Sequence, residues 1–261
     1  MKVLIFDSKA EAVARVVDMI VRQVCDRSNS VLGLATGGTM VPVYAGLVAA
    51  YGDGHVQFSS VTTFNLDEYV GLAANHPCSY ASFMGEHLFS KTDIAGERTH
   101  LPNGVAPNPS LEAIRYENCI VEAGGIDLQL LGIGETGHIG FNEPTSSLNS
   151  PTRIKTLTAK TIAANSQYFR HVEDMPRHAI TMGIGTIQRS RKAVLLAIGT
   201  AKAGAVAAMV EGPVSARVPA SALQFHPHVT VILDQEAAST LELGDYYSTV
   251  HPSGREAELG T

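Results

Sequence analysis

The sequence predicts an α/β fold with an open, mostly parallel sheet and helices on both of its faces. Short apolar runs of strand length alternate along the chain with segments whose apolar residues recur at helical spacing. This alternation is typical of parallel sheets, because a parallel connection is long enough to hold a helix. The 261 residues, of which 45% are hydrophobic and 17% charged, suffice to bury the core of one large domain. We expect that domain over residues 1–243 and a loose C-terminal extension over residues 244–261, where apolar side chains are few.

Each expected element rests on its own local pattern. Runs of about four to eight apolar or β-branched residues between turn residues predict strands, and apolar residues about three to four apart predict helices. The expected strands are residues 1–6, 31–35, 61–64, 126–133, 153–157, 178–182, 193–198 and 229–233. The expected helices are residues 10–24, 41–51, 80–89, 111–121 and 201–210. The run 153–157 alternates polar and apolar residues, which predicts a half-exposed strand.

Charge and cysteine usage argue against several classes of protein. The formal net charge is −6 and the sequence has no run of Lys and Arg, so we expect no nucleic-acid partner. The apolar N-terminal run meets Asp7 too early for a signal peptide, and no segment has the length of a membrane span. Three widely spaced cysteines form neither a zinc pattern nor a disulfide framework. We therefore expect a cytoplasmic protein with reduced thiols, no membrane association and no metal site.

Four of the expected strands end in polar or glycine-rich turns. These turns are Thr36-Gly-Gly-Thr39, Asn65-Leu-Asp-Glu68, Gly134-Glu-Thr-Gly-His138 and Gly199-Thr-Ala-Lys202. The carboxyl ends of parallel strands share one edge of the sheet, and ligands bind at that edge. We therefore expect the four turns to converge on a single crevice.

Two of these turns predict a phosphate site. Thr36-Gly-Gly-Thr39 precedes a helix, where glycines let the backbone approach an anion and free amides can donate to it. Lys202 precedes another helix and would bring a positive charge to the same phosphate. The alternatives are an ordinary strand-to-helix turn and a solvated surface lysine, and neither motif excludes its alternative when taken alone.

The other two turns carry groups for acid–base chemistry. His138 and Glu143 lie five residues apart in a glycine-rich loop, where a carboxylate would fix the tautomer of the imidazole and raise its basicity. A core histidine satisfied by its neighbours is the alternative. Asp67 or Glu68 could remove a carbon-bound proton, although an Asp after a strand more often caps a turn. Spacing alone does not choose between these two carboxylates.

Taken together, these motifs resemble the glucosamine-6-phosphate deaminase family, the isomerising hydrolases of amino-sugar catabolism. The resemblance rests on segments 32–39, 64–72, 76–80, 131–144, 153–157, 181–186, 202–212 and 223–227. It implies a Rossmann-like three-layer sandwich that converts glucosamine 6-phosphate and water to fructose 6-phosphate and ammonia. It also implies that no metal or organic cofactor is needed, because the amine of the substrate can itself become an iminium.

The resemblance implies a role for each candidate residue. Asp67 would move a proton between C2 and C1 of the open-chain sugar, and His138, held by Glu143, would open the pyranose ring. The phosphate would be held by Thr36, Gly37, Gly38, Thr39 and Lys202. Some members are hexameric and allosteric, and they bind N-acetylglucosamine 6-phosphate between subunits. The residues here that resemble that site are Ser146, Arg153, Lys155 and Thr156. The small-molecule partner is therefore expected to be a sugar phosphate, and the chain is expected to form a homo-oligomer, a hexamer if it follows those members.

Two positions depart from the family pattern. Members commonly have Asp or Asn in the ring-opening group where this chain has Thr136, which can hydrogen-bond but carries no charge. Members often have a phosphate-binding Arg where this chain has Gln167, and the nearby Arg170 is the residue that could replace it. These departures bear on the rate and the substrate more than on the fold.

Two alternative functions remain open beside the deaminase. One is a related sugar-phosphate enzyme of the same fold, such as a 6-phosphogluconolactonase, but the segments 65–69 and 141–144 favour the deaminase. The other is a non-catalytic sugar-phosphate sensor. The retention of Asp67, His138 and Glu143 argues against a sensor.

Overall fold

A seven-stranded parallel sheet forms the centre of the molecule. The computed structural model describes residues 1–166, 169, 171 and 174–254. The strands of the sheet are β1 (Lys2–Phe6), β2 (Val31–Leu34), β3 (Thr62–Asn65), β5 (Thr99–His100), β6 (Leu128–Leu131), β9 (Lys192–Ala197) and β10 (Val229–Asp234). Their spatial order is β1-β10-β9-β6-β2-β3-β5, and each neighbouring pair is parallel. The expected parallel sheet is therefore confirmed.

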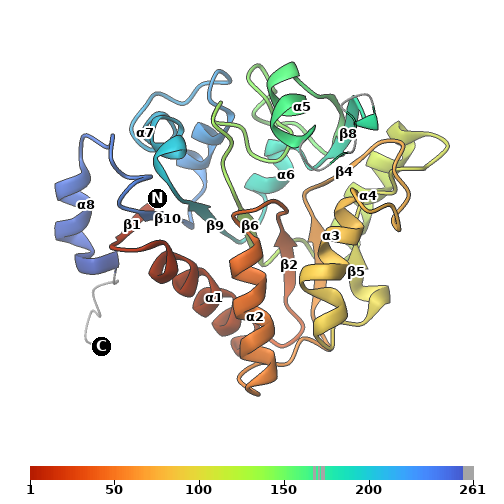
Figure 1. Ribbon diagram of the computed structural model, residues 1–261, viewed down its shortest axis with the longest axis horizontal. Coiled ribbons are helices and arrows are strands. Elements are labelled where there is room, and N and C mark those ends of the chain that lie inside the picture. Colours follow the sequence, from red (N-terminus) through yellow and green to blue (C-terminus); the bar gives the residue numbers. More distant parts are fainter. Residues whose placement is uncertain (167–168, 170, 172–173, 255–261) are drawn as a thin grey trace.

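Helices cover both faces of this sheet. They are α1 (Lys9–Asp26), α2 (Val41–Gly52), α3 (Tyr80–His87), α4 (Pro109–Glu122), α5 (Ala159–Asn165), α6 (Ile184–Gln188), α7 (Ala203–Val210) and α8 (Gly244–Val250). α1 and α2 pack together below the strands in Figure 1, and α6 and α7 lie on the opposite side. In α1, the hydroxyl of Ser8 caps the first turn by accepting from the amide of Glu11. The buried residues of α1 recur at helical spacing and face the sheet.

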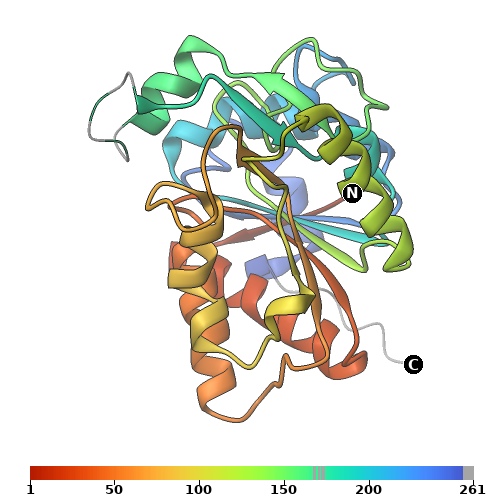
Figure 2. The same ribbon diagram turned by 90° about the vertical axis from the view of Figure 1, so that its right-hand side faces the viewer.

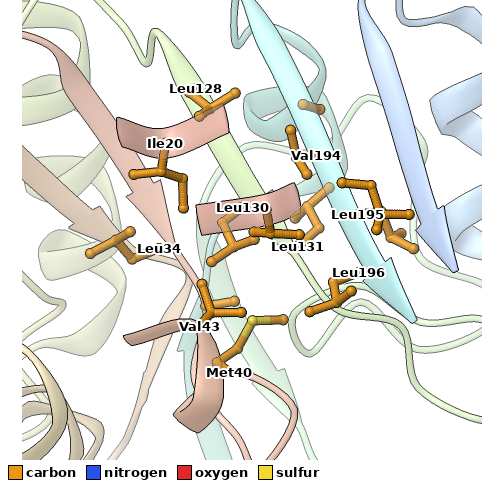
Figure 3. Close-up of a cluster of buried hydrophobic side chains, with 14 of the residues drawn as sticks. Ile20, Leu34, Met40, Val43, Leu128, Leu130, Leu131, Val194, Leu195 and Leu196 are labelled. Carbon is orange, nitrogen blue, oxygen red and sulfur yellow. The ribbon is translucent and has the colours of Figure 1, made fainter. Parts of the chain in front are cut away.

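The main hydrophobic core fills the space between the sheet and its helices. Figure 3 shows side chains of α1 and α2, such as Ile20 and Val43, beside leucines of β6 and β9, such as Leu130 and Leu196. All six residues of β10 and all four of β6 are buried. Strands that are buried on both faces are mostly apolar, which is why they occur as short, nearly continuous apolar runs in the sequence.

A second, smaller sheet lies against the carboxyl edge of the first and was not expected. It consists of β4 (Asp67–Tyr69), β8 (His178–Thr181) and β7 (Arg153–Thr156), paired antiparallel in that order. Leu66 joins the two sheets, because its amide donates to Leu34 O of β2 and its carbonyl accepts from the amide of Met182. Figure 2 shows this layer, with α5, above the main sheet and α1 and α2 below it. The expectation of a simple turn over residues 65–68 is therefore wrong, since Asp67 and Glu68 begin a new strand.

Two further expectations need correction. The apolar run 126–133 forms a strand only over Leu128–Leu131, because the chain turns away at the glycines that follow. The segment after residue 243 is not loose over its described part, since α8 packs on β1 and Gly254 lies against the ring of Phe6. A side chain at Gly254 would collide with that ring, with 2.6 Å between the added Cβ and the nearest ring carbon. The division of the chain into two units at residue 243 stays a prediction.

Candidate active site

The four turns singled out in the sequence meet at one crevice of about 510 Å³. It lies where the strand order changes direction, because the chain runs from β2 to β3 on one side and from β6 to β9 on the other. Such switch points are where open parallel sheets bind ligands. The lining residues from the turns are Thr36, Gly37, Gly38, Thr39, Asp67, Gly134, Glu135, Thr136, His138 and Lys202. The expected convergence is thus confirmed, and the volume suits a small metabolite.

The end of the crevice beside α2 has the features of an anion site. Gly37 has a φ of 110°, a left-handed conformation that side chains other than glycine rarely adopt. A Cβ at Gly38 would meet nothing within 4 Å, so a ligand can approach the backbone there. α2 begins directly afterwards, and its N-cap, Met40, makes no side-chain hydrogen bond to the first turn. Amides at the helix start can therefore donate to an anion.

Lys202 reaches the same crevice from the turn after β9. This turn begins at Gly199, whose φ of 87° again requires the left-handed region. The amide of Gly199 donates to both carboxylate oxygens of Asp234, at 3.0 and 3.1 Å. Asp234 ends β10, so the neighbouring strand fixes the turn that presents Lys202.

Asp67 is buried at the floor of the crevice, on β4. It lies opposite Thr181 of β8, whose hydroxyl donates to Asp67 Oδ2 at 3.5 Å. Burial raises the pKa of Asp67 to about 8, with a smaller contribution from the negative charge of Glu68. The hydrogen bond from Thr181 lowers this pKa but does not offset burial. Asp67 is therefore a carboxylate whose proton affinity is matched to neutral pH, as a general base requires.

Glu68 points away from the crevice into a structural role. Its Oε1 accepts from the amides of Tyr69 and Tyr80 at 2.8 and 3.1 Å, and its Oε2 accepts from the amide of Ala81 at 3.0 Å. Tyr80 and Ala81 form the start of α3, where a carboxylate satisfies unpaired helical amides. Of the two carboxylates between which the sequence did not choose, only Asp67 lines the crevice, which favours Asp67 as the acid–base group.

His138, Glu143 and Thr136 form a hydrogen-bonded cluster in the loop after β6, and His138 and Thr136 line the crevice. His138 Nδ1 lies 3.2 Å from Glu143 Oε2 and 2.7 Å from Thr136 Oγ1. Thr136 donates its hydroxyl to the same Glu143 Oε2 at 3.0 Å. A threonine hydroxyl that donates to the carboxylate must accept from the imidazole, which places the proton of the neutral ring on Nδ1. Nε2 is then the basic nitrogen, left to act on a ligand.

A glycine makes this arrangement of the ring possible. A Cβ at Gly134 would lie 2.1 Å from His138 Nε2, so any side chain there would displace the imidazole. The amide of Gly134 donates to the carbonyl of His138 at 2.9 Å, which closes the loop back on itself. Farther along the loop, the amide group of Asn142 donates to the carbonyls of Ile139 and Met182. The loop is therefore fastened to the end of β8.

Hydrogen bonding keeps Glu143 ionised. Burial is the largest single influence on the pKa of Glu143 and raises it, but the hydrogen bond from His138, the charge of His138 and the bonds described next together outweigh it. Two threonine hydroxyls, of Thr161 and Thr136, lower the pKa further, and the combined effect brings it to about 2. Glu143 is thus a fixed negative charge beside the imidazole, able to stabilise the ring when it takes up a proton.

None of the four residues of the expected second site lines the crevice. Arg153 of β7 donates from Nη1 to the side-chain oxygen of Asn142 at 2.8 Å. Among the residues that the structure describes, neither the buried Nη2 of Arg153 nor the buried hydroxyl of Ser146 has a hydrogen-bond partner. Burial, with the nearby charge of Arg153, lowers the pKa of Lys155. Thr156 is exposed at the end of β7.

Two positions considered for the site cannot be placed in it, and two residues that line the crevice were not predicted. Gln167 and Arg170 lie outside the described residues. Thr161 and Tyr80 line the crevice without having been expected there. Thr161 belongs to a pattern typical of a helix start, and Tyr80 was part of a matching segment but had no assigned role. Nothing in their local sequence marks either as part of a site.

Neither a membrane span nor a metal cluster is found in the part of the chain that the structure describes. No helix there is both long and apolar enough to cross a membrane. Over residues 1–166, 169, 171 and 174–254, no three His, Cys, Asp or Glu side chains are grouped so as to hold a metal ion. Within the described residues, Cys25, Cys78 and Cys119 form no disulfide.

The sequence is similar to that of many curated enzymes. Residues 7–232 match the family described as glucosamine-6-phosphate isomerases/6-phosphogluconolactonase. The glucosamine-6-phosphate deaminase of Hahella chejuensis (strain KCTC 2396) is 57% identical over 251 residues, covering 96% of this chain and 95% of its own length. That of Rhodopirellula baltica (strain DSM 10527 / NCIMB 13988 / SH1) is 54% identical over 231 residues, covering 88% of this chain and 92% of its own.

Solved structures agree with the sequence comparison. A monomeric glucosamine-6-phosphate deaminase superimposes with a TM-score of 0.90 at 41% identity, covering 92% of this chain and 99% of its own. A 6-phosphogluconolactonase from Trypanosoma cruzi superimposes with a TM-score of 0.75 at 19% identity, covering 92% and 97%. The second similarity concerns the fold alone.

Proposed function

The chain belongs to the family of glucosamine-6-phosphate isomerases and 6-phosphogluconolactonases, and from this premise we propose how its crevice acts. It is an enzyme that isomerises and deaminates glucosamine 6-phosphate, giving fructose 6-phosphate and ammonia. The observation that carries the assignment of steps is that one crevice holds two distinct acid–base groups. Asp67 lines it from β4, and His138, hydrogen-bonded to Thr136 and close to Glu143, lines it from the loop after β6.

The first step is the opening of the pyranose ring. His138 Nε2 takes the proton of the C1 hydroxyl and returns it to the ring oxygen as the bond between C1 and that oxygen breaks. The charge of Glu143 stabilises the imidazolium formed in between, and Thr136 keeps the remaining ring proton on Nδ1. An open-chain amino aldehyde results.

The second step is a proton transfer between adjacent carbons. Asp67 removes the proton from C2, which is acidic because it lies beside the C1 carbonyl, while the C1 oxygen takes a proton from the substrate's own ammonium group, and an enolamine forms. The same carboxyl group returns the proton to C1, and the nitrogen at C2 becomes an iminium. Water adds to the iminium carbon, and ammonia leaves as the ketone of fructose 6-phosphate forms. The pKa of Asp67, about 8, suits a group that both takes and returns a proton near neutral pH.

The phosphate would lie at the α2 end of the crevice, away from both reacting carbons. Its contacts would be the amides around Gly37 and Gly38, the hydroxyls of Thr36 and Thr39, and the ammonium of Lys202. These contacts hold the sugar in place through a group that does not react, so their binding energy serves positioning. The proposal includes Arg170 as a further phosphate contact, in place of the arginine that other members have at the position of Gln167.

The second site belongs to the proposal as an anion-binding position. The unpaired hydroxyl of Ser146 and the unpaired Nη2 of Arg153 are buried donors, which favour an anionic partner there. Lys155 and Thr156 would complete it. N-acetylglucosamine 6-phosphate is the expected ligand, and an increase in deaminase activity on its addition would support a regulatory role.

Assembly and location complete the proposal. We expect a homo-oligomer, a hexamer if the second site acts between subunits, although the solved relative is described as monomeric. Light scattering on the purified protein, with and without N-acetylglucosamine 6-phosphate, would measure the mass directly. We also expect the protein to act in the cytoplasm and without a bound cofactor.

The decisive experiment measures both products at once. Purified protein is incubated with glucosamine 6-phosphate, and ammonia and fructose 6-phosphate are assayed in parallel. Formation of the two in a one-to-one ratio is expected. A protein that binds the sugar phosphate without releasing either product would contradict the proposal and favour the sensor, and hydrolysis of 6-phosphogluconolactone instead would favour the lactonase.

A further inference from the structure

A threonine at the start of α5 completes the hydrogen bonding of Glu143 from the side opposite His138. Thr161 donates its hydroxyl to Glu143 Oε1, while Glu143 Oε2 faces His138 and Thr136. The two carboxylate oxygens therefore have separate sets of partners. Glu143 is 5% exposed and Thr161 is 6% exposed, so little water can compete for these bonds.

Thr161 is itself held in place by the first turn of α5. Thr158 is the N-cap of α5, and its hydroxyl oxygen accepts from the amide of Thr161 at 3.2 Å. The hydroxyl oxygens of Thr158 and Thr161 lie 2.9 Å apart, and that of Thr158 lies 3.5 Å from Glu143 Oε1. Two hydroxyls of one helical turn thus face the same carboxylate oxygen.

We propose that Thr161 is a positioning residue for ring opening, acting through Glu143. The terminal torsion of a glutamate is broad, so its carboxylate plane is set by its partners. With Thr161 on Oε1, Oε2 is held toward His138 Nδ1, and the imidazole keeps the tautomer with a basic Nε2. This inference rests on the proposed function, because it concerns the step assigned to His138 and Glu143.

Two substitutions separate the hydroxyl from the rest of the side chain. Thr161→Val keeps the shape and removes the donor, so kcat/KM for glucosamine 6-phosphate should fall by about 10-fold to 100-fold, as expected for a lost hydrogen bond to a charged group. Thr161→Ser keeps the donor and should stay within about threefold of the wild type. A matched control is Thr186→Val, since Thr186 is also buried and also donates to a glutamate, Glu117, but outside the crevice.

A kinetic isotope effect distinguishes positioning from a general loss of structure. With substrate deuterated at C2, the wild type should show an isotope effect on kcat/KM to the extent that proton removal by Asp67 limits the rate. If Thr161→Val slows ring opening, that earlier step limits the rate and the isotope effect should fall toward one. The ratio does not depend on the fraction of folded enzyme, so partial unfolding cannot imitate this result.

The outcomes are distinct. A reduced isotope effect in Thr161→Val, with wild-type values in Thr161→Ser and Thr186→Val, would support the inference. An unaltered kcat/KM in Thr161→Val, a loss of activity with an undiminished isotope effect, or equal damage by Thr161→Ser would overturn it. A wild type that releases no ammonia would overturn the proposed function and this inference together, so the two failures can be told apart.

Discussion

Two carboxylates of the active site have opposite properties. Asp67, on β4, is buried near another acid, and its pKa is raised to about 8. Glu143, in the loop after β6, is also buried, but the hydrogen bonds from His138 and two threonines, with the charge of His138, lower its pKa to about 2. Burial raises both pKa values, so hydrogen-bond donors and the sign of the neighbouring charge decide the difference.

The difference separates a carboxylate that exchanges a proton from one that only supplies charge. A group with a pKa near the working pH can accept a proton and return it, which the transfer from C2 to C1 requires. A group with a very low pKa stays ionised and orients the histidine beside it. One crevice can thus run two proton transfers with two carboxylates in different roles.

Removal of the Asp67 carboxylate, which exchanges the proton, should have the largest effect on activity. Asp67→Asn keeps the shape and removes the base, so ammonia release should fall by about 100-fold to 10,000-fold. Binding of fructose 6-phosphate, measured by calorimetry, should change little because the phosphate contacts are remote. Wild-type turnover by this variant would exclude Asp67 as the base at C2.

Loss of the imidazole should have the next largest effect. His138→Gln removes the basic nitrogen, so kcat/KM for the cyclic substrate should fall by about 100-fold. An acyclic 2-amino-2-deoxyhexitol 6-phosphate, which needs no ring opening, should inhibit the variant and the wild type equally. Weaker inhibition of the variant would mean that His138 acts in binding and not in ring opening.

The pH profile tests the raised pKa of Asp67 directly. The base must be ionised in the free enzyme, so kcat/KM should rise about tenfold per pH unit below pH 8 and level off above it. In the Asp67→Glu variant the position of this rise should shift, whereas it should stay in place in Thr136→Ser. A profile already flat from pH 6 upward would show that Asp67 ionises more readily than its burial suggests.

Substitution of Thr136, the uncharged member of the ring-opening cluster, should reduce activity less than substitution of His138. Thr136→Val removes the hydroxyl that bridges His138 and Glu143, so kcat/KM should fall by about tenfold, the effect of one hydrogen bond. Thr136→Ser should restore activity. Because His138 Nδ1 also lies 3.2 Å from Glu143 directly, a loss as large as that of His138→Gln would contradict this arrangement.

Stability should respond in opposite directions at the two carboxylates. The folded pKa of Asp67 lies above its unfolded value of about 3.9, so wild-type stability declines as pH rises from about 4 to 8, and Asp67→Asn should raise the melting temperature above pH 8. The folded pKa of Glu143 lies below its unfolded value of about 4.3. Its stabilisation is present above that value and lost as pH falls toward 2, so Glu143→Gln should lower the melting temperature at neutral pH. Melting curves of the wild type and both variants from pH 2 to 9 would show both trends, and a change of the same sign in both variants at neutral pH and above would contradict the comparison.

The sequence predicted the parallel sheet and the convergence of its turns, because both depend on local patterns. Apolar runs, helical spacing and glycines after strands are short-range signals. The choice between Asp67 and Glu68 depended on β4 pairing with β8, and Thr181 lies 114 residues from Asp67. No spacing rule reaches across that distance.

Long-range contacts also explain the other misses. Thr161 follows Glu143 by 18 residues and meets it only because β7 returns the chain to the crevice. α8 has few apolar residues, yet Tyr247 packs against the core and Gly254 meets Phe6 at the other end of the chain. In the small sheet, β7 and β8 were expected as strands, but β4 has only three residues, and the pairing of the three strands joins segments far apart in the sequence.

Strand β8 and the residue after it hold both acid–base groups of the crevice in place. Thr181 donates to Asp67, and the carbonyl of Met182 accepts from Asn142 in the loop that carries His138. Warming that loosens this one short strand would disturb both chemical steps together, while the buried seven-stranded sheet remained intact. Heat inactivation should therefore precede the melting of the fold. The highest temperature at which the enzyme works should depend on the small sheet that contains β8 and not on the core of the seven-stranded sheet.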